Sequence, residues 1–238
     1  MHERKAFVFA DVHGFYKRME ALLLQEGIID EDGQRIDNET LIICTGDLGD
    51  FRRDSKDRDL RAYELADDWI DLMLWGNHDY SMINKKIAFS GYTDPHPETA
   101  KIMLDWMAMG KLRFAAQTHG FLLTHAGLHR FAMDEDYDLA GWVDALNDWT
   151  CNHQFITNIP PHRGGWDNWG GIIWRDDDEA LHSGLQQIYG HSRGQTTRQY
   201  GEKGHYSYCL DIGYHHVPSL AGIWLPEERV ARVDNVDE

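Results

Sequence analysis

Residues 5–14 read KAFVFADVHG, an apolar run that stops at Asp11. Residues 15–27, FYKRMEALLLQEG, follow with apolar side chains at helical spacing and close on a glycine, which commonly ends a helix. A strand that leads through a short polar turn into a helix is the repeating unit of α/β folds. The opening of the chain therefore predicts an α/β domain.

The same alternation continues through the first half of the chain. The expected segments are a strand at 41–47, a helix at 61–70 after a charged loop, a strand at 71–79, a helix at 97–112 and a strand at 121–127. In the second half, four short strands follow one another and suggest a meander, at 185–192, 206–213, 220–226 and 229–233. Alternation followed by consecutive strands predicts an α/β fold with mixed sheets.

The chain is expected to form a single domain over residues 1–238. A Trp-rich segment at about 142–174 interrupts the pattern, because it is also rich in Asn, Gly and Pro. This segment is either an insertion that forms a wall or lid over a site, or ordinary packing by its tryptophans. The tryptophans concerned are Trp142, Trp149, Trp166 and Trp169.

The composition limits the classes of ligand. The 40 Asp and Glu residues outnumber the 23 Lys and Arg residues, and the formal net charge is −17. Because affinity for nucleic acids comes largely from Lys and Arg that neutralise phosphates, a nucleic-acid partner is not expected. An acidic protein that handles phosphate must do so locally, and a bound metal ion is a direct way to do it.

Cysteine usage and hydropathy indicate the compartment. Cys44, Cys151 and Cys209 form no CxxC pair, which argues against a disulfide scaffold and a thiolate zinc site. No apolar run approaches the ~20 residues that span a bilayer. The N-terminal segment lacks the apolar core and cleavage site of a signal peptide. We therefore expect a cytoplasmic protein with no membrane partner.

Five apolar strands run into small clusters of Asp, His, Asn and Gly. The clusters are Asp11-Val12-His13-Gly14, Gly46-Asp47-Leu48-Gly49-Asp50, Gly76-Asn77-His78-Asp79, His125-Ala126-Gly127 and Gly190-His191-Ser192. In open α/β sheets, sites form in the crevice beyond the carboxyl ends of the strands. One crevice is therefore expected to gather Asp11, His13, Asp47, Asn77, His78, His125 and His191.

The residue types in these clusters indicate the ligand. Carboxylates, imidazoles and an amide, without thiolates, favour manganese, iron, zinc or a similar ion over a structural zinc site. Asp11 and His13 are two residues apart and face the same way in an extended chain, so they can chelate one ion. Asp47 is the candidate bridge to a second ion. Two ions ~3.5–4 Å apart can clamp a phosphate and lower the pKa of a bound water.

The charge expected at this site also favours a phosphate ester. Two divalent ions bring four positive charges, and Asp11, Asp47 and a bridging hydroxide remove three, while Asn77 is neutral. The remaining charge of about +1 attracts a phosphate dianion despite the acidic surface. Each cluster alone has a structural explanation, such as a turn, a helix cap or a buried histidine. Five clusters in strand-end positions together favour the metal site.

These clusters, in this order, resemble the calcineurin-like metallophosphoesterase superfamily, and more closely its phosphoprotein-phosphatase branch in bacteria and phages. The resemblance runs from Asp11 to about Val233. It implies a calcineurin-like fold, in which two mixed β-sheets form a sandwich flanked by α-helices. It also implies two divalent metal ions, with manganese expected first and iron, zinc, nickel or cobalt as alternatives.

The resemblance assigns roles to the clustered residues. Asp11 and His13 would hold the first metal, Asp47 would bridge, Asn77, His125 and His191 would hold the second, and His78 would protonate the leaving group, oriented by Asp50. The wider superfamily pattern ends in Gly-His-x-His, but residues 190–193 read Gly-His-Ser-Arg. The first metal is therefore expected to carry extra water.

The arginines depart from the branch. The branch usually continues Gly-Asp-x-Val-Asp-Arg-Gly, with an Arg that grips the substrate phosphate, but Phe51 takes that place here. Arg52 or Arg53 would have to reach back to the phosphate. Arg175, in the sequence Ile-Trp-Arg, resembles a second phosphate clamp, with an offset from Trp174 that is shorter by one.

The leading hypothesis is a phosphatase that hydrolyses phosphomonoesters by attack of a metal-bridging hydroxide. The expected substrate is a phosphorylated Ser or Thr of a protein, or a small phosphate ester. One alternative is a symmetrical dinucleoside polyphosphate (diadenosine tetraphosphate) hydrolase, which the third and fourth clusters also resemble. An alternative of another class is a non-catalytic metal-binding protein that keeps the fold without the chemistry.

Overall fold

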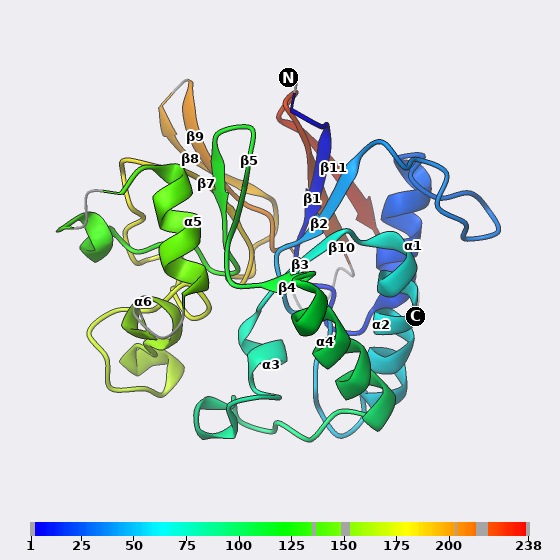
Figure 1. The fold of residues 1–238 in the computed structure, drawn as a ribbon, viewed down its shortest axis with the longest axis horizontal. Coiled ribbons are helices and arrows are strands. Elements are labelled where there is room, and N and C mark those ends of the chain that lie inside the picture. The colour runs from blue at the N-terminus through cyan, green and yellow to red at the C-terminus, as the bar shows by residue number, and fades with distance from the viewer. Residues whose placement is uncertain (1–2, 135–136, 149–152, 203, 213–218, 237–238) are drawn as a thin grey trace.

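Two mixed β-sheets lie face to face at the centre of the protein, in a computed structural model that describes residues 3–134, 137–148, 153–202, 204–212 and 219–236 (Figure 1). The first sheet has the order β11 (Arg229–Asp234), β10 (Ser219–Leu225), β1 (Ala6–Phe9), β2 (Leu41–Cys44), β3 (Leu72–Leu74) and β4 (Leu112–Arg113). The second has the order β5 (Ala116–Thr118), β6 (Phe121–Leu123), β7 (Gln186–Tyr189), β9 (His205–Cys209) and β8 (Arg198–Glu202). The predicted sandwich of mixed sheets is confirmed.

Alternation along β1 divides the core into two layers. Phe7 and Phe9 face the helices on the outer side of the first sheet, whereas Ala6 and Val8 face the second sheet. The layer between the sheets is built from small and branched side chains of both, including Leu123. Burial of both faces explains why the strands read as nearly continuous apolar runs.

Helices cover the outer faces of both sheets. The helices are α1 (Tyr16–Gln25), α2 (Lys56–Trp69), α3 (Asn77–Tyr80), α4 (Pro97–Met109), α5 (Leu139–Asn147) and α6 (His153–Thr157). Figure 1 shows α1, α2 and α4 on one side of the molecule and α5 and α6 on the other. No helix in the described part of the chain is long and apolar enough to cross a membrane.

Parallel pairing sets the direction of the strands that matter for the site. In the first sheet β1, β2, β3 and β4 are parallel neighbours, and in the second β6, β7 and β9 are parallel neighbours. Parallel strands have their carboxyl ends at the same edge of a sheet. The turns that follow these strands therefore meet at one edge of the sandwich.

Three expectations for the elements need correction. Helix α2 begins at Lys56 rather than residue 61, because Asp57 and Asp59 in its first turn favour the positive end of the helix dipole. The predicted meander is wrong, since β10 and β11 return to the first sheet beside β1. All seven residues of β10 are buried, as expected for a strand in the interior of a sheet rather than at its edge. Strand β8 was not expected.

The Trp-rich segment combines both readings that its sequence allowed. Trp142 of α5 is buried, Trp169 packs against the core, and Trp166 is 96% exposed. The segment also supplies Arg163 to the wall of a pocket described below. Trp149 and Cys151 lie outside the described residues, and Cys44 and Cys209 are buried free thiols.

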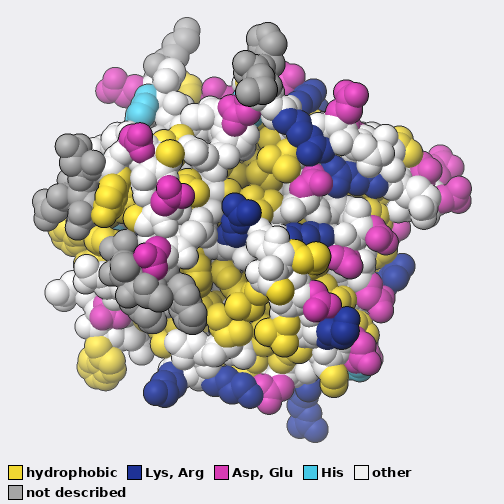
Figure 2. All heavy atoms as spheres, viewed as in Figure 1, with side chains coloured by type: hydrophobic (Ala, Val, Ile, Leu, Met, Phe, Trp, Pro, Cys, Tyr) yellow, Lys and Arg dark blue, Asp and Glu magenta, His cyan; other side chains and the backbone are white. Residues whose placement is uncertain are grey.

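Acidic and basic side chains are mixed on the surface. On the face drawn in Figure 2, Lys and Arg are interspersed with Asp and Glu.

Tight packing of β10 on β1 gives a test of the fold. A Cβ added at Gly222 would lie 2.4 Å from the ring of Phe7. We expect Gly222→Ala to lower the free energy of unfolding by about 1–3 kcal/mol, because overpacking forces the neighbours to shift. Gly120→Asn is the matched control, since a Cβ there meets nothing within 4 Å and Asn tolerates its positive φ. Equal losses in both variants, measured by chemical denaturation, would contradict the packing argument.

Candidate metal centre

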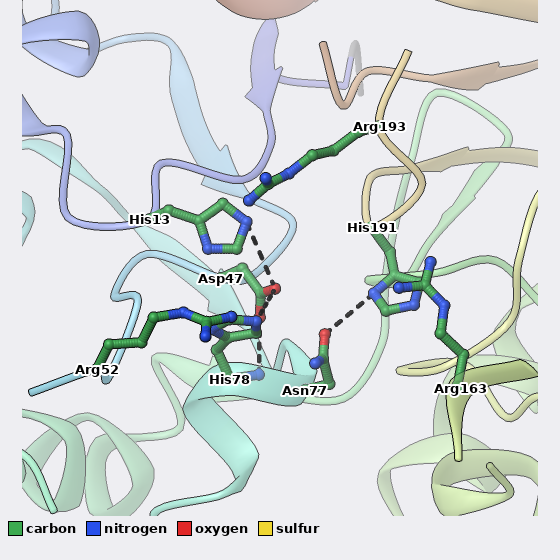
Figure 3. Close-up of a pocket in the computed structure, with 8 residues that line it drawn as sticks. All are labelled: His13, Asp47, Arg52, Asn77, His78, Arg163, His191 and Arg193. Atoms are coloured by element: carbon green, nitrogen blue, oxygen red, sulfur yellow. Dashed lines mark hydrogen bonds and ion pairs between the residues drawn. The ribbon is translucent and has the colours of Figure 1, made fainter. Parts of the chain in front are cut away.

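Residues from five turns meet at the carboxyl-terminal edge of the two sheets, and Figure 3 shows several of them. The predicted ligands follow the strands in order, with Asp11 and His13 after β1, Asp47 after β2, Asn77 at the start of α3 after β3, His125 after β6 and His191 after β7. The structure thus brings together residues that are up to 180 positions apart, since the backbone N–H of His191 donates to Oδ2 of Asp11 at 2.9 Å.

The carboxylate of Asp47 lies at the centre of this group. Its Oδ2 is 3.9 Å from Nε2 of His13 on one side and 3.5 Å from Nε2 of His125 on the other. On the second side, Oδ1 of Asn77 lies 3.0 Å from Nδ1 of His191 and 3.2 Å from Nε2 of His125. A carboxylate between two sets of ligand atoms is placed as a bridge between two ions would be.

The backbone at these positions is held in an unusual conformation. Asp11, His13, Asp47 and His191 have φ values of 50°, 51°, 50° and 70°. Non-glycine residues in the left-handed region cost on the order of 1–3 kcal/mol each and cluster at functional sites, where the surrounding structure holds them. The strained turns aim the four side chains inward.

Burial sets the ionisation of the group. It is the main cause that raises the pKa of Asp11 and Asp47 well above the usual value, and nearby carboxylates raise both further. It also lowers the pKa of His13 and His191 well below the usual value, and that of His125 to about 3. Neutral imidazoles are the form that binds metals.

Several buried polar atoms face this centre without a hydrogen-bond partner. They are Oδ1 of Asp11, Nδ1 of His13 and Nε2 of His191. Buried polar atoms are nearly always paired in folded proteins, so unpaired atoms on ligand-type side chains call for an ion or water. The donor set, its burial and its unpaired atoms fit two divalent metal ions.

His78 lies beside the predicted metal ligands and is held by a hydrogen bond at its edge and by stacking on one face. Its Nδ1 is 2.8 Å from the backbone carbonyl of Asp50 and 3.6 Å from the carboxylate of Asp50. Its ring stacks on Phe89 with centroids 3.8 Å apart. Asp50 therefore orients His78 mainly through its main-chain oxygen, and its carboxylate also pairs with Arg52. Burial lowers the pKa of His78 to about 3.

Asp79 is a part of the site that the sequence reasoning missed. Its Oδ2 accepts hydrogen bonds from the backbone N–H groups of Asp47 at 2.7 Å and Gly76 at 3.0 Å, and its Oδ1 accepts one from the hydroxyl of Tyr63 at 2.6 Å. Burial raises the pKa of Asp79 to about 6. Asp79 ties the turn after β2 to the turn after β3, and it was visible as the last residue of the third cluster.

Asp211 is the second missed residue. It is buried two residues beyond the end of β9, which is parallel to β7. Its carboxylate is the first of the charged neighbours that raise the pKa of Asp11. The strand-end pattern that identified the predicted ligands also applies to the segment YSYCLDIG, which contains Asp211.

The arginines are placed differently from the prediction. A pocket of about 270 Å³ over the ligands is lined by Arg52, as expected, and by Arg163 and Arg193, which were not expected. Arg53 is exposed and does not line it. Arg175 does not line it either, because its guanidinium is buried and donates to backbone carbonyls, including that of Ala126 at 2.8 Å. Arg53 and Arg175 therefore do not lie with the other predicted site residues in the lining of this pocket.

Arg163 reaches the pocket from the Trp-rich segment. Its Nε donates to Oδ2 of Asp176 at 2.6 Å, and its terminal nitrogen pairs with the other carboxylate oxygen. Asp176 also accepts a hydrogen bond from the hydroxyl of Ser192 at 2.9 Å. A two-point ion pair fixes the plane of a guanidinium, so Arg163 is held facing the metal ligands. No spacing rule in the sequence connects residues 163 and 176.

The model of the calcineurin-like phosphoesterase family matches residues 5–232. The chain belongs to this family. No protein with curated annotation matches the sequence. The calcineurin-like phosphoesterases are hydrolases of phosphate esters that typically use a dinuclear metal centre, and the donor set described above has the composition for it.

Solved structures share the fold at low identity. A cold-active protein-tyrosine phosphatase of a psychrophilic Shewanella species has a TM-score of 0.61 at 16% identity, with 98% of this chain and 80% of that chain covered. A candidate diadenosine tetraphosphatase has a TM-score of 0.56 at 16% identity, covering 99% and 96%. A protein serine/threonine phosphatase from Saccharomyces cerevisiae has a TM-score of 0.58 at 12% identity, covering 99% and 81%.

The fit of the calcineurin-like centre to metal ions can be tested without substrate. At a Mn²⁺ concentration 100 times the dissociation constant, we expect a stabilisation of ~2.7 kcal/mol, or roughly 5–10 °C in melting temperature for a domain of this size. Asp47→Asn should lose most of this shift, because the proposed bridge is gone. Asp105→Asn, at an exposed carboxylate of α4, is the matched control. A chelator-treated protein that Mn²⁺ does not stabilise would contradict the centre.

Proposed function

We propose that this protein is a metal-dependent phosphatase that hydrolyses phosphomonoesters, with phosphoserine or phosphothreonine of a protein as the preferred substrate. One observation carries the proposal. Four of the six predicted metal ligands, the predicted acid His78 and three arginines line one pocket of about 270 Å³, which has room for a phosphate group. The four ligands are His13, Asp47, Asn77 and His191. Phosphoryl transfer depends mainly on positioning and charge neutralisation, which this set of groups can supply.

Two divalent ions in this pocket, held by the six predicted ligands, would neutralise phosphate charge and lower the pKa of a water molecule. The guanidinium groups of Arg52, Arg163 and Arg193 bind the non-bridging phosphate oxygens. Nδ1 of His78 donates a hydrogen bond to the carbonyl of Asp50, and the other nitrogen, Nε2, lies 4.0 Å from the carboxylate of Asp47. A dianionic substrate beside this ring raises its pKa, and Nε2 then donates a proton to the leaving oxygen.

Hydrolysis of a dinucleoside polyphosphate is the second candidate, and one observation favours it. Arg163 and Arg193 also line a neighbouring cavity of about 630 Å³. Two arginines shared by adjoining cavities could contact a second phosphate group, which a phosphomonoester lacks. A non-catalytic protein is the weaker alternative, because the six ligand side chains and the acid are all retained.

Turnover by the Mn²⁺-loaded protein distinguishes these functions. We expect hydrolysis of p-nitrophenyl phosphate and a phosphoserine peptide, with slower turnover of diadenosine tetraphosphate. His78→Asn should lower kcat about 10²–10⁴-fold, because the proton donor is lost. His205→Asn, at an exposed histidine of β9, is the matched control. Absence of metal-dependent turnover on all three substrates would refute the phosphatase.

The arginine assignment predicts a separate kinetic effect. Arg163→Ala should raise KM for p-nitrophenyl phosphate and weaken inhibition by inorganic phosphate, each about 10–100-fold, because a hydrogen bond to a charged group contributes ~1.5–3 kcal/mol. Arg53→Ala removes an exposed guanidinium that does not line the pocket and serves as the control. If the two variants lose phosphate affinity equally, phosphate binding depends on the overall positive charge, and Arg163 does not contact the phosphate specifically.

A further inference from the structure

Asp211 is a buried carboxylate for which neither the family pattern nor the proposed mechanism has a use. Its side chain is 2% exposed, and its Oδ2 has no hydrogen-bond partner. A carboxylate buried in this way is costly unless a cation or hydrogen-bond donors compensate it. The position therefore calls for a partner that protein atoms do not provide to Oδ2.

The strand register places Asp211 beside His191, one of the predicted metal ligands. Strands β7 and β9 are parallel with Tyr189 opposite Cys209, so the chain continues two residues further to His191 on one strand and Asp211 on the other. The hydrogen bond from the N–H of Leu210 to the carbonyl of Tyr189, at 2.8 Å, shows that the pairing extends beyond the strand ends.

Asp11 lies against the same pair of strand ends. Its carboxylate accepts a hydrogen bond from the backbone N–H of His191, and a Cβ added at Gly190 would lie 1.9 Å from its Oδ1. Only glycine allows this approach. Asp211 is also the strongest of the charged neighbours that raise the pKa of Asp11. Each of these two carboxyl groups leaves one oxygen without a hydrogen-bond partner.

The sequence leaves room for another ligand at this ion. Where the wider superfamily has a second histidine, this chain has Arg193, so Asp11, His13 and Asp47 are the protein ligands expected for the first metal. Figure 3 shows the guanidinium of Arg193 extending toward His13 rather than offering a ligand atom. Arg198 and Arg163 also act on Asp211, but they are already paired with Asp177 and Asp176. A divalent ion can supply the positive charge that the three buried carboxylates still lack.

We propose that Asp211 is an additional acidic residue of the first metal site and, with Asp11 and Asp47, binds that ion. The inference rests on the dinuclear centre of the proposed function but does not depend on which phosphate ester is hydrolysed. It differs from a role in the backbone alone, in which the carbonyl of Asp211 accepts a hydrogen bond from the N–H of Gly194 at 3.2 Å. That bond survives a change of side chain.

Metal binding to Asp211→Asn tests the proposal in the absence of substrate. Calorimetric titration of the chelator-treated full chain with Mn²⁺ should show one of the two ions bound about 10–100-fold more weakly than in the wild type. The metal-free variant should melt no lower than the metal-free wild type, because one of three repelling carboxylates is gone. Asp177→Asn makes the same charge change at a carboxylate paired with Arg198 and should bind Mn²⁺ normally.

Two outcomes would overturn the proposal. One is wild-type affinity for both ions in Asp211→Asn. The other is an equal loss of Mn²⁺ affinity in Arg193→Ala, which would mean that Asp211 acts only by holding Arg193. The proposal expects Arg193→Ala to bind Mn²⁺ as tightly as the wild type or more tightly, since a neighbouring positive charge is removed. If Asp211→Asn does not fold, Asp211→Glu takes its place, because it keeps the charge on a longer side chain and should also weaken the binding of one ion. Failure of the phosphatase assays would leave these measurements unaffected.

Discussion

Asp11, Asp47 and Asp211 are nearly fully buried where the two sheets meet, and their negative charges repel one another. A fold does not gather like charges in its interior unless cations compensate them. The strained left-handed turns add to this cost. The apolar layer between the sheets offsets both, because it fixes the carboxyl ends of β1, β2, β7 and β9 beside one another whether or not an ion is bound.

A second set of carboxylates holds the turns without facing the pocket. Asp79 ties the turn after β2 to the turn after β3. Asp59 on α2 accepts hydrogen bonds from the backbone N–H groups of Asp50 and Phe51, at 2.9 Å each. The helix therefore positions the carbonyl that orients His78. Phe51 packs against Tyr63 in the core, which explains why the arginine usual in the branch cannot occupy this position and still reach the pocket.

The sequence could predict residues whose positions depend on local pattern, but not residues whose positions depend on long-range contacts. Residues at strand ends were found because the position of a strand end depends on local pattern, and five such ends point to one edge. The same rule covers Asp211, which was overlooked rather than hidden. The place of Arg163 in the pocket could not be predicted from the sequence, because its orientation depends on an ion pair with Asp176, 13 residues away. The sheet to which β10 belongs could not be predicted either, since the sequence of an apolar strand does not indicate which strands it pairs with.

The predicted metal ligands and the pocket arginines are carried by different parts of the fold. The metal ligands stand on turns fixed by the sheets, so their geometry tolerates little change. Two of the three arginines in the pocket come from loops, and Arg163 belongs to a segment anchored by the buried Trp142 and the packed Trp169. Loops on a rigid scaffold are where binding preferences change most readily. The strands of this protein thus position the predicted metal ligands, whereas loops and the Trp-rich segment supply the arginines that line the pocket.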